Sequence, residues 1–496
     1  MSIRNDLGTL EASGLVQVAA LEPELEYLFR HALVQDAAYS SLLKQDRRAL
    51  HRLAADTLVA LYADRARELA AVIALHLERA GDPAAAAAHL VIAGEHALER
   101  FANREALTFF DRADASLTAD DPRVELRLRA ALGAAKASWT FSGPTAAIER
   151  LERALAAGEA SADRKLVGDV SFWIAFLRRL RGEQPETSPE LRRAIDRAAD
   201  IGAQLGDPLA QALPNGFMAI GMMFTGQLRP GTRLLESSLE AMESRVDPLS
   251  AAIMAGLLTI GNSRLGDFAA AERSLAFAER LAKNGDPIAA LDVEIARSAV
   301  LVERGDIAEG EALASSCAMR SEVLGAVACG VTANVIAGAG HLAHDDPHGA
   351  EAPLVRGEEL ALVASMAPFQ TLAEGMLGSV RVRLGDAAGG TAMWTVALER
   401  ARGMNDRYGE AITVWQRAHA RAGGEPADHA GALEDLDVAV RLFEAMEALP
   451  SLARALRDRA RILRALGRTD EAATSDRRST EIALALGLRD FTTASA

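Results

Sequence analysis

The sequence is poor in cysteine and in aromatic residues. Only two of its 496 residues are cysteine, which excludes a disulfide-stabilised scaffold and leaves too few thiolates for a cysteine-rich zinc site. Aromatic residues make up 4% of the chain while hydrophobic residues reach 50%, so Ala, Leu and Val carry the apolar content. Because Ala and Leu favour helices and aromatic residues favour strands, this balance predicts an all-α protein.

Basic residues are fewer than acidic residues, and only four of them are lysine. Lys and Arg total 54 against 69 Asp and Glu, which gives a formal net charge of −15. A chain of this charge is repelled by the phosphate backbone of DNA and RNA. We therefore expect no direct nucleic-acid partner.

Long uninterrupted apolar runs are also missing. Residues 208–228 and 323–343 lack charge, but Pro214 interrupts the first and the polar residues Thr332 and Asn334 interrupt the second. A membrane-crossing helix needs ~20 predominantly apolar residues, so we expect two buried helices instead. The first residues show no basic segment followed by an apolar one, as a secretory signal would. The sequence therefore predicts a cytoplasmic protein with no membrane partner.

A repeat of about 40 residues is the strongest pattern present. Turn residues recur at spacings of 40, 39, 40 and 40, namely Gly226, Gly266, Gly305, Asp345 and Gly385. A second series pairs Asp with Pro, at Asp207-Pro208, Asp247-Pro248 and Asp286-Pro287. Gly ends a helix in the left-handed conformation, Asp caps the next helix, and Pro fits its first turn. Two helices in every repeat of fixed length predict an α-solenoid.

Small residues follow these turns at fixed positions. Five residues after each turn comes the first small residue, in order Gly231, Ala271, Gly310, Ala350 and Gly390. Seven residues later comes a second, in order Ser238, Ala278, Cys317, Gly357 and Ala397. A larger apolar residue lies between them in most repeats, at Leu235, Leu275, Leu354 and Trp394. Spacings of four and three place all three on one helix face, where the small residues let neighbouring helices approach closely.

This pattern resembles the tetratricopeptide repeat (TPR). The clearest unit holds Ala106, Phe110 and Ala113 at the family's small, aromatic and small positions. The resemblance implies a right-handed α-solenoid of about ten TPR-like helix pairs, which we place at residues 51–490, with a disordered tail at residues 491–496. It implies a binding surface but no particular chemistry.

Residues 1–50 do not follow the repeat. Residues 7–14 are predicted to form a short helix, followed by a small hairpin. The string FRHALVQDAAY at residues 29–39 is similar to a segment of STAND-type bacterial signalling ATPases. In those proteins, which include ATPase-fused class III adenylate or guanylate cyclases and maltose-activator-type regulators, the segment closes a winged-helix element and leads into a TPR-like arm. The resemblance implies a small winged-helix-like remnant at residues 1–50.

No catalytic motif of the ATPases or cyclases accompanies this resemblance. None of the four lysines follows a glycine, so the sequence holds no G-x-x-x-x-G-K-[ST] phosphate loop, and it carries neither the ATPase nor the cyclase part. A cluster of metal-ligand residue types surrounds His341 and His344, but its aspartates fall on turn and cap positions of the repeat. Cys317 takes a small packing position. We therefore predict no enzyme, no catalytic residue, no metal site and no cofactor.

A ligand is expected on the concave face of the solenoid, which the first helix of each TPR unit lines. In the middle repeats the concave positions are apolar and suggest a groove at Ile220, Met223 and Ile260. In the last two repeats they are basic, at Arg417, Arg421, Arg454, Arg457, Arg461 and Arg464. Because arginine binds carboxylate and phosphate through two parallel hydrogen bonds, these six residues are candidates for binding a partner that is acidic or phosphorylated. The alternative is a solvated face paired with neighbouring Asp and Glu.

Two functions fit the sequence. The first is a non-enzymatic protein–protein interaction or scaffold module in bacterial signal transduction or transcriptional regulation, which docks a protein or peptide on its concave face. The second is the small-ligand sensor arm of a signalling ATPase or adenylate cyclase regulator, or a fragment of one, in which a small-molecule effector changes the curvature of the solenoid. A thermal shift with a metabolite distinguishes a sensor from a docking module.

Overall fold

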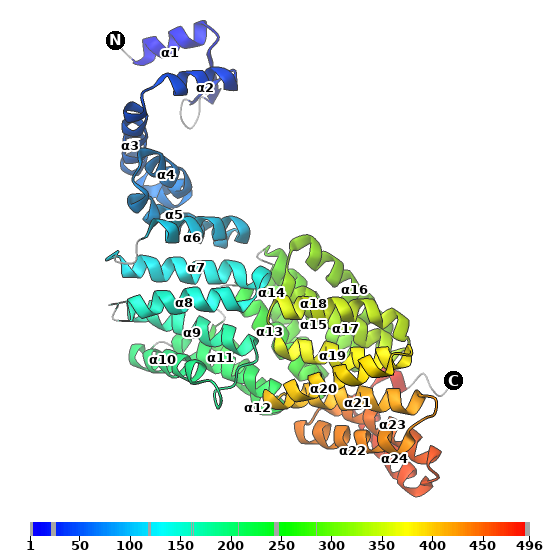
Figure 1. The fold of residues 1–496 in the computed structure, drawn as a ribbon. Coiled ribbons are helices and arrows are strands. Elements are labelled where there is room, and N and C mark those ends of the chain that lie inside the picture. The colour runs from blue at the N-terminus through cyan, green and yellow to red at the C-terminus, as the bar shows by residue number, and fades with distance from the viewer. Residues whose placement is uncertain are drawn as a thin grey trace. The chain divides into compact units, whose positions relative to one another are not determined.

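The computed structural model of the chain describes residues 3–20, 26–117, 121–159, 161, 163–206, 208–242, 248–283 and 285–491. Over these residues it forms 24 α-helices and one two-stranded sheet (Figure 1), which confirms the predicted all-α fold. The chain divides into two compact units. One contains residues 1–96 and 108–121, and the other contains residues 97–107 and 122–496.

The first unit begins with a helix and a hairpin. Its elements are α1 (Ile3–Ala12), β1 (Val16–Ala20), β2 (Glu26–Phe29), α2 (Ala32–Ser41), α3 (Lys44–Leu61), α4 (Ala66–Ala80), α5 (Pro83–Glu99) and α6 (Asn103–Ser116), the last two of which extend into the second unit. The strands are antiparallel, with Val16 opposite Phe29 and Val18 opposite Tyr27. The predicted helix and hairpin are therefore present.

The boundary predicted after residue 50 falls inside α3. His51, which lies on this helix, is buried and contacts residues on both sides of the boundary. Its Nε2 lies 2.9 Å from the hydroxyl of Tyr39 on α2, and its Nδ1 lies 2.8 Å from Nδ1 of His76 on α4. Because these contacts join three helices, the residues of the predicted remnant share their packing with the helices that follow.

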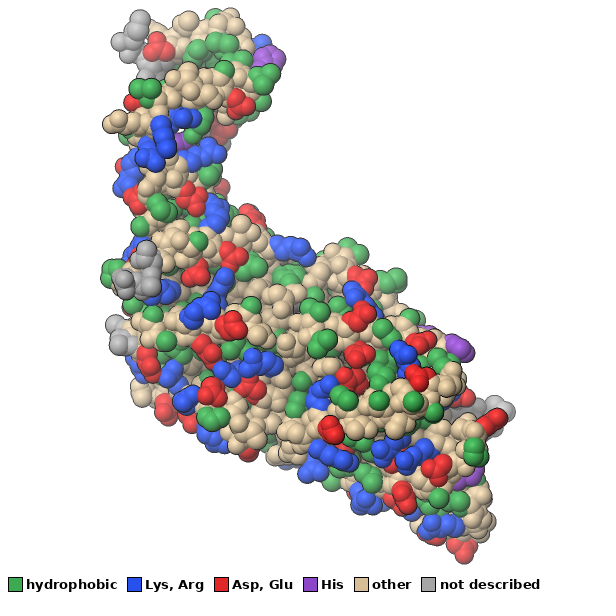
Figure 2. Space-filling model, viewed as in Figure 1, with side chains coloured by type: hydrophobic (Ala, Val, Ile, Leu, Met, Phe, Trp, Pro, Cys, Tyr) green, Lys and Arg blue, Asp and Glu red, His purple; other side chains and the backbone are tan. Residues whose placement is uncertain are grey.

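Several large apolar side chains of the first unit face solvent. The exposed fraction is 82% for Leu33, 72% for Leu43 and 62% for Leu53. Figure 2 shows hydrophobic side chains at the surface of α1 and α2. Such sparse burial predicts low local stability for the part of this unit that precedes α4, whereas Ile73 of α4 and Leu90 of α5 are fully buried.

The second unit is a continuous series of helices. They are α7 (Val124–Ser142), α8 (Pro144–Gly158), α9 (Arg164–Leu180), α10 (Pro189–Leu205), α11 (Pro208–Phe224), α12 (Leu228–Met242), α13 (Pro248–Leu265), α14 (Phe268–Ala282), α15 (Pro287–Arg304), α16 (Ile307–Leu324), α17 (Val327–Ala343), α18 (Pro347–Val363), α19 (Ala367–Arg383), α20 (Ala387–Gly403), α21 (Arg407–Gly423), α22 (His429–Met446), α23 (Leu449–Ala465) and α24 (Thr469–Leu486). Along the chain, α5/α6 to α23/α24 form ten pairs, which agrees with the predicted number. No helix in the described part of the chain is long and apolar enough to cross a membrane.

The repeated turn and packing positions explain this regularity. Every turn residue of the first series is left-handed, with φ of 85° at Gly226, 79° at Gly266, 97° at Gly305, 62° at Asp345 and 101° at Gly385. The larger apolar residues between the small ones are at most 5% exposed, at Leu235, Leu275, Leu354 and Trp394. The helix pairs therefore pack through the residues that the 40-residue repeat singles out.

One predicted helix cap is wrong. Asp267 accepts a hydrogen bond from the backbone N–H of Ala270 at 2.9 Å, as a cap should, but Asp306 makes no such bond. Its carboxylate instead accepts a 2.8 Å hydrogen bond from Arg489, near the end of the chain. The arginine competes with the backbone for this carboxylate because a charged donor binds it more strongly.

The last helix pair of the second unit packs against helices of its middle repeats. Helix α23 packs against α13 and α15. Beyond α24, a short 3₁₀ helix (Arg489–Phe491) brings Phe491 against Arg457. The guanidinium carbon of Arg457 lies 4.2 Å from the centroid of the Phe491 ring. The tail predicted for residues 491–496 thus has an ordered first residue, and residues 492–496 lie outside the described residues.

Candidate binding site

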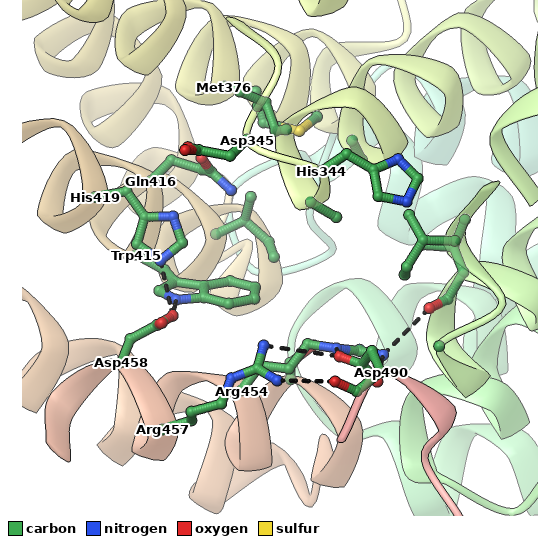
Figure 3. Close-up of a pocket in the computed structure, with 18 of the residues that line it drawn as sticks. His344, Asp345, Met376, Trp415, Gln416, His419, Arg454, Arg457, Asp458 and Asp490 are labelled. Atoms are coloured by element: carbon green, nitrogen blue, oxygen red, sulfur yellow. Dashed lines mark hydrogen bonds and ion pairs between the residues drawn. The ribbon is translucent and has the colours of Figure 1, made fainter. Parts of the chain in front are cut away.

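A cavity of about 1370 Å³ lies on the inner side of the last five repeats. Its walls come from the turn between α15 and α16, the end of α17, and helices α19, α21 and α23. Figure 3 shows Trp415 and His419 on one side of the cavity and His344 on the other. The first helices of the repeats form this site, as the TPR resemblance implies.

Helix α21 supplies an aromatic wall. Tyr408, Ile412, Trp415 and His419 line the cavity at helical spacing. The indole N–H of Trp415 donates to Asp458 over 2.9 Å, and Nε2 of His419 lies 2.7 Å from the same carboxylate (Figure 3). Burial alone would raise the pKa of Asp458, but His419 and the indole hydrogen bond outweigh it and hold that pKa below its usual range. Asp458 is therefore an anion that fixes both rings.

Helix α23 supplies a buried arginine. Arg454 donates from Nε to Asp490 over 2.9 Å and from Nη2 to the backbone oxygen of Glu303 over 3.0 Å. Its side chain is only 10% exposed. Burial raises the pKa of Glu303, and the guanidinium groups of Arg454 and Arg264 oppose that rise. Arg454 is thus committed to holding the protein together and has few donors left for a ligand.

The next two arginines of α23 are more open. Arg457 is 43% exposed; its Nη1 donates to the backbone oxygen of Asp490 over 3.3 Å, and its Nη2 lies 3.7 Å from the carboxylate of that residue. Arg461 is 64% exposed and lies 4.0 Å from Asp458, a carboxylate that His419 and Trp415 already engage. Both line the cavity, so they keep guanidinium donors available for an incoming anion.

The structure does not bring the six predicted arginines together. Arg417 and Arg421 each donate to Asp435 on α22 over 2.9 Å and line a separate pocket beside Trp394. Arg464 binds Asp476 on α24 and lines a third pocket. Of the six, only Arg454, Arg457 and Arg461 line the large cavity, where Arg383 and Arg489 join them.

A register error explains the misplaced pair. Leu372 of α19 lines an apolar cavity together with the predicted positions Ile220, Met223 and Ile260. Adding the 40-residue repeat to Leu372 leads to Ile412, which does line the large cavity, and not to Arg417. Continuing from Met376 in the same way leads to Gln416, another cavity residue. The 40-residue repeat alone is therefore sufficient to predict which residues of α21 lie on its inner face. Trp415 is adjacent to one of them, Gln416.

The predicted apolar positions do lie together. Ile220, Met223 and Ile260 line one cavity of about 130 Å³ with Leu372 and further apolar side chains. This apolar cavity borders the large one, because the same six residues line both, namely Val302, Glu303, Ala339, Met376, Tyr408 and Ile412. The role of these positions in binding stays a prediction.

The residues considered for metal or nucleophilic chemistry have structural partners. His341 Nδ1 lies 3.1 Å from Asp346, and His344 Nδ1 lies 3.2 Å from Glu311. Within the described ranges no group of three His, Cys, Asp or Glu side chains has the geometry to hold a metal ion. Burial raises the pKa of the Cys317 thiol to about 11, so it stays protonated at neutral pH.

Comparison with known proteins gives the fold and little beyond it. No family model and no curated protein sequence matches the chain. A crystal structure of a Rap protein complexed with competence and sporulation factor aligns over 73% of this chain and 98% of its own, with 14% identity and a TM-score of 0.54. Weaker likenesses include the APC/C hetero-tetramer Cut9-Hcn1 (12% identity, TM-score 0.48, 92% of this chain and 90% of its own). They also include the STAND protein with a tetratricopeptide repeat sensor PH0952 from Pyrococcus horikoshii (12% identity, TM-score 0.40, 77% of this chain and 56% of its own).

Fold and repeat positions together define a TPR-like helical-repeat protein. The finer resemblance to the helical arms of cyclase-fused ATPases and maltose-activator-type regulators stays a prediction.

Proposed function

We propose that the chain is a non-enzymatic interaction module of bacterial signalling, which binds an extended acidic segment of a peptide or protein in the 1370 Å³ cavity. The observation that carries this proposal is the pair Arg457 and Arg461, two incompletely neutralised cations that line the same cavity as the indole of Trp415. Guanidinium groups bind carboxylates in a fork geometry, and an aromatic ring supplies contact area for the adjoining backbone and side chains.

The size of the cavity favours a peptide over a small molecule. Pockets for small ligands usually measure ~300–1,000 Å³, and this cavity exceeds that range. The Rap protein, whose fold is similar, was crystallised in complex with competence and sporulation factor. That likeness supports a binding role for such a solenoid, while the choice of ligand rests on the cavity alone.

A small-ligand sensor is the second candidate, and the apolar 130 Å³ cavity favours it. An apolar effector in this cavity would contact α11, α13, α17 and α19 at once. Because it would bridge four repeats, its binding would favour one curvature of the solenoid. It would raise the melting temperature, and the rise would grow with the logarithm of ligand concentration once that concentration exceeds Kd.

The experiment that tests docking combines a peptide library with matched variants. The parent chain is panned against random eight-residue peptides, and the enriched peptides are then titrated by fluorescence anisotropy. We expect enrichment in Asp and Glu, and at least a tenfold loss of affinity in the variant Arg457→Glu/Arg461→Glu. Arg464→Glu is the control, because Arg464 lies on the same helix but faces Asp476 outside the cavity. Enriched peptides without acidic residues, or equal binding by all three proteins, would contradict the proposal.

A further inference from the structure

A small cavity of about 60 Å³ lies deeper in the second unit and is rich in aromatic rings. Trp139 of α7, Phe176 of α9, Phe224 of α11 and Phe369 of α19 all line it. The rings form two edge-to-face pairs. The centroids of Trp139 and Phe176 are 5.2 Å apart, and those of Phe224 and Phe369 are 6.2 Å apart. Four separate helices thus contribute an aromatic side chain to one space.

A carboxylate shares this space. Asp292 of α15 lines the same cavity, and no hydrogen bond or ion pair joins it to any residue within the described ranges. Burial raises its pKa to about 7. On the facing helix α13 stands Gly256, where an added Cβ would come within 2.6 Å of Oδ2 of Asp292. The glycine leaves the room that the carboxylate occupies.

The isolation of Asp292 contrasts with three other acids of this unit. Glu303 faces Arg454, Asp435 faces Arg417 and Arg421, and Asp458 faces His419. An ionised carboxylate in apolar surroundings is costly unless a partner balances its charge. Asp292 has no such partner among the described residues, so a cation that entered the cavity would balance its charge.

The chemistry of the walls specifies that group. The faces of aromatic rings attract cations, and a carboxylate attracts them more strongly, so rings and carboxylate together select a positive charge. The volume admits an ammonium group with its attached methylene groups and excludes a bulky ring system. We propose that this cavity is a subsite for a primary ammonium group, with Asp292 as its counter-ion and the four aromatic side chains as its walls.

The ligand has room to continue beyond the ammonium. The 60 Å³ cavity shares Ile220, Phe224, Leu257, Ile260, Thr332 and Phe369 with the 130 Å³ apolar cavity. An alkyl chain attached to the ammonium would occupy that apolar space. The ammonium comes either from a free alkylamine or from a lysine of a docked peptide, and only the second source rests on the proposed function.

The test is calorimetric and uses n-pentylammonium and its neutral isostere 1-pentanol at pH 8. We expect the parent to bind n-pentylammonium at least tenfold more tightly than 1-pentanol. Asp292→Asn should lose this preference and keep its affinity for the alcohol, while Glu309→Gln, which removes an acid of the large cavity, should keep the preference. Equal affinity of the parent for both probes, or an unchanged preference in Asp292→Asn, would overturn the proposal.

Two further arms separate this subsite from the docking proposal. Arg457→Glu/Arg461→Glu should bind n-pentylammonium as the parent does, so a failure of peptide docking leaves the result intact. A library-selected peptide with one lysine is then compared with its Nε-acetylated form. A tenfold loss on acetylation assigns the ammonium to the peptide, and an unchanged affinity assigns it to a free amine. Gly256→Ala should weaken the binding of n-pentylammonium, because its methyl group displaces the Asp292 side chain.

Discussion

Arg454 and Glu303 are 151 residues apart in the chain, yet a 3.0 Å hydrogen bond joins Nη2 of the arginine to the backbone oxygen of the glutamate. Their charged groups also form an ion pair at 3.4 Å. Helix α23 of the tenth pair is thereby tied to α15 of the sixth. The contact closes the inner space of the solenoid and forms one wall of the large cavity.

Removing this arginine should destabilise the protein strongly. Arg454→Met removes the cation of the buried ion pair with Glu303, and breaking a buried pair in this way costs about 3–5 kcal/mol. Urea denaturation followed by circular dichroism measures the free energy of unfolding. Arg464→Met, which removes an exposed arginine, should change it by less than about 1 kcal/mol. Equal effects of the two variants would show that the closing contact contributes little.

The stability of the parent should decrease as the pH rises, because of Asp292. Its folded-state pKa of about 7 lies above its ordinary value of 3.8, so ionisation is easier in the unfolded chain. The favourable contribution of the protonated group is complete below pH ~4 and is lost as the pH rises through 7.

Asp292→Asn should therefore be more stable than the parent at pH 8, by at most about 4 kcal/mol, with a smaller difference at pH 5. The nearby thiols of Cys317 and Cys329 stay protonated over this range because burial raises their pKa values. Urea titrations at pH 5, 6, 7 and 8 measure the difference. A difference that does not grow with pH would contradict the assignment of an isolated carboxylate.

Two glycines should respond in opposite directions to alanine. An added Cβ at Gly378 would collide with the indole of Trp394 and lie 3.0 Å from the backbone oxygen of Gly390, so Gly378→Ala should cost about 1–3 kcal/mol. At Gly403, the last residue of α20, nothing lies within 4 Å of the added Cβ. Gly403→Ala should stabilise the protein by up to ~1 kcal/mol through helix propensity. Thermal melting measures both, and a loss at Gly403 equal to that at Gly378 would refute the packing argument.

The hairpin and α2 should be the least protected part of the described chain. Leu28, Phe29 and Leu33 are 57%, 42% and 82% exposed, and no residue of α2 is buried. Hydrogen exchange followed by mass spectrometry should show amides of residues 26–41 exchanging faster than those of α13 or α17. Comparable protection in these segments would contradict the low stability expected of residues 26–41.

The sequence predicts most of the fold because the repeat encodes it locally. A left-handed glycine and a small packing residue constrain the backbone within one helix pair. The roles of Gly266 and Ala271 can therefore be predicted without knowing how the other repeats pack. The same reasoning found the apolar positions Ile220, Met223 and Ile260, which do line one cavity.

Long-range contacts could not be predicted in this way. The pairing of Arg489 with Asp306, and of Arg454 with Glu303, depends on how far the solenoid winds in each repeat. A small error in that winding changes which residue meets which. For the same reason the sequence could not show that Asp292 lies among four aromatic rings from four other helices.

The most direct test of peptide docking is to locate the bound peptide. A library-selected acidic peptide carrying a benzophenone is irradiated with the parent chain, and the cross-linked residue is identified by mass spectrometry. Benzophenone reacts readily with methionine, and the chain offers Met376 inside the large cavity and Met319, 66% exposed, outside it. The proposal predicts cross-links at Met376 and Trp415 that unlabelled peptide suppresses. Cross-links at Met319 or on α2 that the unlabelled peptide suppresses equally would contradict it.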